Sequence, residues 1–122
     1  MERDLKTRTK DFALRIVKLY SALPGRRDAQ VLGTQILKAG TSVGAHYREA
    51  RRAKSDADFI SKMEGALQEL DETAYWIELI GDAGILPQRR LKSLEEEAEE
   101  LLAILVTIVT KVKKKRRMRR QS

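Results

Sequence analysis

The stretch LKAGTSVGAHYREARR, residues 37–52, decides how the rest of this chain is interpreted. Apolar positions continue through it at steps of three and four, the spacing of a helix: Leu32, Ile36, Ala39, Val43, Tyr47 and Ala50. Gly40 and Gly44 interrupt this helix, and each costs about 1 kcal/mol relative to alanine. Because the period survives both glycines, we predict a helix over residues 28–53 whose small residues let a second helix approach closely.

Three further segments carry the same periodicity, and we expect them to form helices over residues 4–23, 56–81 and 87–112. Pro24 stops the first segment, Ser55 is a candidate N-cap for the third, and Pro87 suits the first position of the last. No strand pattern separates them. Four long amphipathic segments with short connections predict an all-α fold, an up-down-up-down antiparallel four-helix bundle. The broad apolar faces of 4–23 and 56–81 indicate assembly into a homo-oligomer.

The totals bound the chain to one domain, because 122 residues support a single core. We place that domain at residues 1–112 and a basic tail at 113–122. Cysteine is absent and His46 is the single histidine, which argues against a catalytic metal site, a catalytic triad or a bound cofactor. The prediction is a protein that is not an enzyme. The charged start and an apolar run, 101–109, too short to span a bilayer predict a cytoplasmic protein without a membrane segment.

The net charge of +7 comes from one segment. Eight bases and no acid lie between residues 111 and 120: Lys111, Lys113, Lys114, Lys115, Arg116, Arg117, Arg119 and Arg120. Without them the chain has 17 basic and 18 acidic residues, a net charge of −1. Such a run favours sequence-independent binding to phosphates. Two other readings stay open, a solvated C-terminus and attraction to an anionic membrane surface. Arg51, Arg52 and Lys54 are further candidates for nucleic-acid contact.

A polar cluster is expected where the two central helices cross. Its candidates are His46, Tyr47, Arg48, Glu49, Glu64, Glu69 and Asp71. We expect Arg48 to pair with Glu64 or Asp71, which would lock the crossing. His46 is either a half-buried structural residue or a binding residue. The six aromatic residues fall at positions compatible with the core.

The string GTSVGAHYREARRAKSDADFISKMEGALQELDETAYWIEL, residues 40–79, resembles the signature of the 23S rRNA intervening-sequence proteins. The matching positions are Gly40, Ser42, Val43, Gly44, Tyr47, Arg48, Glu49, Ala50, Phe59, Glu69, Asp71, Glu72, Tyr75 and Trp76. His46 stands where the resemblance implies asparagine. The resemblance implies a four-helix bundle that assembles as a ring-like homopentamer. Similar bundles are accessory proteins of reverse transcriptases in diversity-generating retroelements, where they present a basic surface to nucleic acid.

Taken together, the tail and the resemblance predict a non-enzymatic oligomer that binds nucleic acid, with RNA or a ribonucleoprotein as the first candidate. The alternative is a protein-interaction scaffold or accessory subunit, for example of a reverse transcriptase. In that reading the apolar faces and the acidic residues of 56–81 dock the partner.

Overall fold

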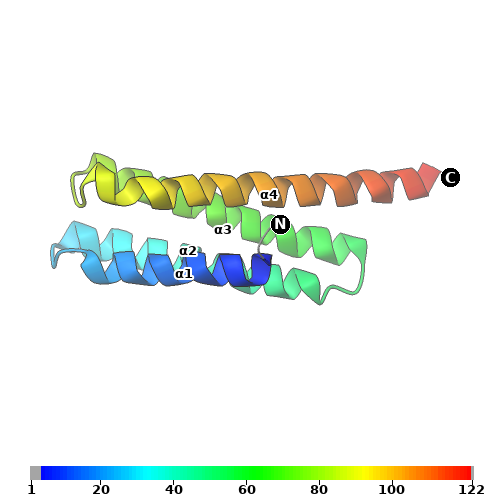
Figure 1. The fold of residues 1–122 in the computed structure, drawn as a ribbon. Helices are drawn as coiled ribbons and strands as arrows, with labels where there is room; N and C mark the ends of the chain where they lie inside the picture. The colour runs from blue at the N-terminus through cyan, green and yellow to red at the C-terminus, as the bar shows by residue number, and fades with distance from the viewer. Residues whose placement is uncertain (1–3, 122) are drawn as a thin grey trace.

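The computed structural model describes residues 4–121 and contains four helices. They are α1 (Leu5–Ala22), α2 (Arg27–Arg51), α3 (Asp56–Asp82) and α4 (Gln88–Gln121). Consecutive helices run antiparallel and pack side by side, α1 on α2, α2 on α3 and α3 on α4 (Figure 1). The predicted up-down-up-down bundle is therefore confirmed, and no strand occurs in the described range.

All four helices contribute side chains to one continuous apolar core. Its largest fully buried side chains include Phe12 and Ile16 of α1, Ile36 of α2, Leu70 of α3 and Leu101 of α4. The seam between α1 and α4 is the loosest of the four, because those two helices approach each other least. Two surface grooves open along that seam.

Glycines bring α1 and α2 together, as the sequence predicts. A Cβ on Gly40 would lie 2.7 Å from Cγ1 of Ile16, and one on Gly33 would lie 2.7 Å from Cδ1 of Leu23. Carbon atoms attract optimally at about 3.5–4.0 Å, so neither position tolerates a side chain without movement. Gly33 and Gly40 thus lack side chains at the positions where Leu23 and Ile16 fill the space.

Helix ends differ from the sequence prediction in places. The helix α2 begins at Arg27 with Arg26 as its N-cap, one residue before the predicted start. Ser55 does cap α3, since its Oγ accepts a hydrogen bond from the Asp58 N–H at 3.1 Å. Pro87 lies directly before α4.

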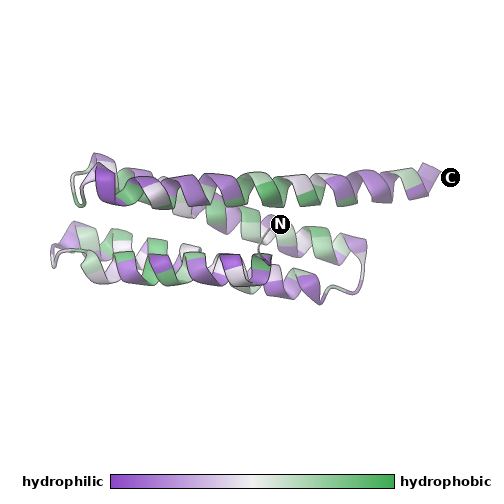
Figure 2. Cartoon of the chain, viewed as in Figure 1, coloured by the Kyte–Doolittle hydropathy of each residue, from purple (hydrophilic) through white to green (hydrophobic). Residues whose placement is uncertain are grey.

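The largest difference is at the end of α4. We predicted a helix to about residue 112 and a separate tail, but α4 continues without interruption to Gln121. Lysine and arginine are good helix formers, and contacts with α3, described below, hold two of the tail's bases. The last turns are mainly hydrophilic (Figure 2), and α4 ends beyond the α2–α3 connection (Figure 1).

Candidate nucleic-acid interface

The end of the bundle near the α2–α3 connection carries the bases proposed for nucleic-acid contact, and we call them the basic end. It comprises Arg51, Arg52, Lys54, Lys111, Lys113, Lys114, Lys115, Arg116, Arg117, Arg119 and Arg120. The last eight belong to the final turns of α4. Leu5, the first residue of α1, shares a groove with Ile104 and Ile108. The turns of α4 that follow therefore run past the start of α1, and α1 does not cover them.

A groove of about 400 Å³ is shared by the end of α2, the α2–α3 connection, α3 and α4. Ala50 and Arg51 of α2, Lys54 of the connection, Phe59 of α3 and Val112 of α4 line it. Arg51 and Val112 are some sixty residues apart in the sequence, and they share this groove because of the antiparallel path of the helices.

Three bases of the basic end are engaged by carboxylates. Lys113 Nζ lies 2.7 Å from Oε2 of Glu64 on α3, and Arg119 pairs with Asp56, the first residue of α3. Arg51 lies 3.9 Å from Asp4. Within residues 4–121 the other eight form no ion pair: Arg52, Lys54, Lys111, Lys114, Lys115, Arg116, Arg117 and Arg120. These bases are available to phosphates.

The expected polar cluster is divided by the structure. Arg48 forms no ion pair with any described residue, so its predicted pairing with Glu64 or Asp71 is wrong. Glu64 instead accepts a hydrogen bond from Lys113 of α4 at 2.7 Å. Asp71 likewise lines a groove between α3 and α4.

His46 and Glu49 do come together, with 3.4 Å between His46 Nδ1 and Glu49 Oε1. The imidazole lies against Gly65 of α3, where a Cβ would approach Nδ1 to 3.1 Å. Glu69 accepts a hydrogen bond from the Thr73 hydroxyl at its main-chain oxygen. The imidazole thus lies at the contact between α2 and α3, and Gly65 is the residue that makes room for it.

Tyr47 is half-buried against the core. Burial raises the pKa of its phenol, because loss of water disfavours the phenolate. Tyr47 is therefore a neutral packing residue beside the basic end, not an anion that would compete with phosphates.

An inter-helix ion pair that the sequence analysis missed joins α1 to α4. Arg8 Nε and Nη2 donate to the two oxygens of Glu97 at 2.9 Å each, and Nη2 also lies 2.8 Å from Glu100. The Arg8 side chain is 11% exposed. Hydrogen bonds from both carboxylates raise the pKa of the guanidinium above its ordinary value. The sequence does carry one indication of this burial, because Arg8 follows Leu5 by three residues and precedes Phe12 by four, which places it on their apolar face.

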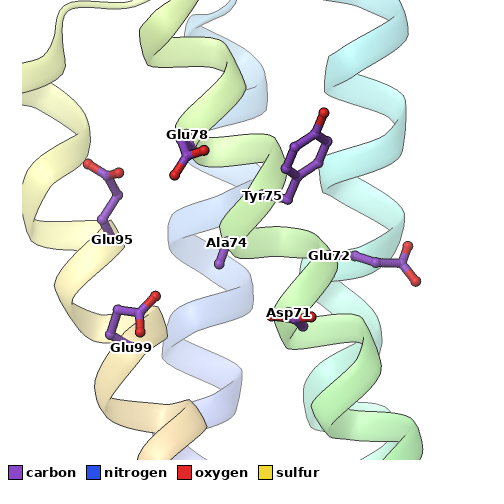
Figure 3. Close-up of a pocket in the computed structure, with 7 residues that line it drawn as sticks. All are labelled: Asp71, Glu72, Ala74, Tyr75, Glu78, Glu95 and Glu99. Atoms are coloured by element: carbon purple, nitrogen blue, oxygen red, sulfur yellow. The ribbon is translucent and has the colours of Figure 1, made fainter.

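An acidic groove of about 510 Å³ lies between α3 and α4, lined by Asp71, Glu72, Ala74, Tyr75, Glu78, Glu95 and Glu99. Glu95 and Glu99 of α4 flank the gap opposite α3, while Glu72 points away from α4 (Figure 3). Tyr75 is 55% exposed, which contradicts the expectation that every aromatic packs in the core. Its ring rests edge-on against Trp76 at 5.2 Å.

The described residues contain no group of three or more histidine, cysteine or acidic side chains placed to hold a metal ion. In the same part of the chain, no helix combines the length and apolarity needed to cross a membrane.

A compact antiparallel four-helix bundle with a basic end is the class of protein that these features define. The chain belongs to the family described as 23S rRNA-intervening sequence protein, which it matches over residues 2–107. A crystal structure of a protein of unknown function from the S23 ribosomal protein family of Bacteroides thetaiotaomicron is similar, with 39% identity and a TM-score of 0.82. The match covers 87% of this chain and 98% of that one. A search of curated proteins gives no match.

The bases of α4, from Lys111 onward, lie outside the matched range of residues 2–107. Arg51, Arg52 and Lys54 lie inside it. The basic end thus combines a part of the family fold with an extension beyond it.

Proposed function

We propose that this protein binds nucleic acid without sequence preference through the basic end, and that it acts as a binding protein without catalysing a reaction. The observation that carries the proposal is the gathering, at one end of the bundle, of eight bases that form no ion pair within residues 4–121, two from the α2–α3 connection and six from α4. Neutralised phosphates release condensed counterions, so several such bases give strong, salt-sensitive binding. RNA is the first candidate because the family description refers to ribosomal RNA.

Charge reversal at the end of α4 tests the proposal. Lys114→Glu, Lys115→Glu and Arg117→Glu in one variant replace three exposed bases of the basic end. Removing about three phosphate contacts lowers affinity roughly 100-fold at about 0.1 M salt and flattens the salt dependence by about 3 in the log–log slope. Fluorescence anisotropy with labelled RNA measures both quantities.

The matched control reverses three exposed bases further along α1, Lys10→Glu, Arg15→Glu and Lys18→Glu, for the same change in net charge. It should bind nearly as well as the unmodified protein, because exposed charges beyond about 10 Å are screened at 0.1 M salt. Equal affinity of both triple variants, or salt-insensitive binding, would count against the basic end as the site.

We also propose that copies of the chain associate, with a homopentamer as the expected form. Support comes from large apolar side chains on the outside of the bundle, among them Leu14 at 56% and Val17 at 43% exposure on α1. Association would place several copies of the basic end on one assembly. Several linked sites bind one ligand with higher avidity than a single site, although each site makes the same interactions. Native mass measurement tests this, and a monomer at micromolar concentration would reject it.

A protein-interaction role is the second candidate, and the acidic groove favours it. Tyr75 is exposed beside five carboxylates, and exposed aromatic residues are enriched at interfaces. The partner would be a basic polypeptide, such as a reverse transcriptase. Co-purification that survives nuclease treatment and depends on Tyr75 would support this function, and loss of the partner on nuclease treatment would oppose it.

A further inference from the structure

The composition of the basic end restricts the form of nucleic acid that it can hold, an inference that rests on the proposed function. Exposed aromatic side chains are missing from it. Among the described residues the one aromatic counted as exposed is Tyr75, which lies in the acidic groove. Phe59 is half-buried and packs against the core. Proteins that hold single strands without sequence preference combine a basic groove with aromatic platforms on which bases stack. The basic end has the first element and lacks the second.

The arrangement of its bases favours a ligand with phosphates on more than one line. Helical residues are separated by about 100° and rise about 1.5 Å each. Lys114, Lys115 and Arg117 therefore project to different sides of α4, while Arg52 and Lys54 add charge from the neighbouring connection. A single strand offers one line of phosphates. A double helix offers two lines across a groove, and it carries one charge per roughly 1.7 Å of axis.

The acids of the molecule limit the position of that ligand. Glu95 and Glu99 lie on the N-terminal half of α4, beside Glu78 and Asp71 of α3. Phosphates placed along the α3–α4 face would meet these carboxylates. The favourable position is across the end of the bundle, where α2 and α4 both supply bases and the carboxylates Asp56 and Glu64 are already engaged by Arg119 and Lys113.

We propose that the basic end binds double-stranded nucleic acid through the phosphates of both strands, and binds it more tightly than single strands. The recognised chemistry is the paired sugar–phosphate backbone, which duplex RNA and duplex DNA share. The polar side chains that line the groove at this end are Arg51, Lys54, Ser55 and Asp56, and Asp56 is engaged by Arg119.

The experiment measures the affinity of the full-length protein for four labelled probes of about 24 nucleotides or base pairs, over a salt series. The probes are duplex RNA, duplex DNA, oligo(U) and oligo(dT). We expect the duplexes to bind at least about 10-fold more tightly at 0.1 M salt. For about six phosphate contacts, their log–log salt slope should be steeper by about 1, since each contact contributes about 0.9 for a duplex and 0.7 for a single strand.

Tighter binding of either duplex than of both single strands supports the inference, and the comparison of the RNA and DNA duplexes identifies which source is preferred. Equal or tighter binding of the single strands, with measurable affinity, overturns the inference and leaves the proposed function intact. Absence of salt-sensitive binding to all four probes overturns both.

The triple reversal of Lys114, Lys115 and Arg117 locates the duplex, with the α1 triple as its control. Duplex affinity should fall about 100-fold in the first variant and change less than about 3-fold in the second. All six side chains are exposed, so both variants should keep the helical circular dichroism of the unmodified protein. An equal loss in the two folded variants would overturn the assignment to the basic end.

Discussion

The α1–α2 seam and the α3–α4 seam differ in the residues that form them. Between α1 and α2, Gly33 and Gly40 remove side chains so that Leu23 and Ile16 fill the space. Between α3 and α4, carboxylates line an open groove, and further along α4 the charge reverses into the basic end. The first seam has no room for a ligand and serves stability. The second leaves carboxylates and bases exposed to solvent, where a ligand or partner can contact them.

Breaking the first seam should have the largest effect on stability. Leucine at position 40 (Gly40→Leu) would overlap Ile16, which lies 2.7 Å from the position of the new Cβ. Overpacking of this kind costs about 3 kcal/mol of unfolding free energy. Urea denaturation followed by circular dichroism measures it. Ala45→Leu places the same side chain at an exposed position of α2 and should change stability by less than about 0.5 kcal/mol.

The ion pair of Arg8 should have the next largest effect. Arg8→Met removes the guanidinium that Glu97, 16% exposed, shares with Glu100. We expect a loss of about 2 kcal/mol, below the 3–5 kcal/mol typical of fully buried pairs. Arg15→Met is the control, because Arg15 makes an exposed hydrogen bond to Ser93. Equal losses in the two variants would show that Arg8 acts as an ordinary surface residue.

The ion pair between Glu64 of α3 and Lys113 of the basic end should contribute less to stability than that of Arg8. Glu64→Gln removes the exposed pair with Lys113, and exposed pairs contribute about 0.5 kcal/mol or less. The midpoint temperature of thermal unfolding should be slightly lower in the variant. This difference should disappear at about 1 M salt, where the screening length is about 3 Å. The variant should also bind duplex slightly more tightly, because Lys113 is released. A salt-independent loss above about 1 kcal/mol would mean that Glu64 has a packing role instead.

The smallest effect concerns the first turn of α2. The hydrogen bond from Arg26 lowers the pKa of Asp28 below its ordinary value, and the Ala29 N–H contributes in the same direction. A lowered folded-state pKa stabilises the fold above the ordinary pKa, and this contribution is lost as pH falls through the folded-state pKa. Arg26→Ala should raise the pKa of Asp28, measurable by carboxyl-carbon NMR titration. An unchanged pKa would assign the shift to the main chain alone.

How far the sequence predicts each region depends on whether the signal is local. The helices and the close approach at Gly40 follow from the spacing of apolar and small residues, and the structure confirms both. The partners of charged residues do not follow. The sequence predicts that Arg48 pairs with Glu64 or Asp71, but Glu64 binds Lys113, because a pairing depends on the rotation and axial offset of two helices. A spacing pattern within one helix carries no information on either quantity.

The sequence by itself determined four amphipathic helices, the order in which they pack, and a body of net charge −1 followed by a run of eight bases, since these properties depend on residues near one another in the chain. Tertiary structure decided that the run continues α4, that it lies beside the bases of α2, and that Arg8 is buried between Glu97 and Glu100. The physical reason is that charges distant in sequence interact only after apolar packing has fixed the register of the helices.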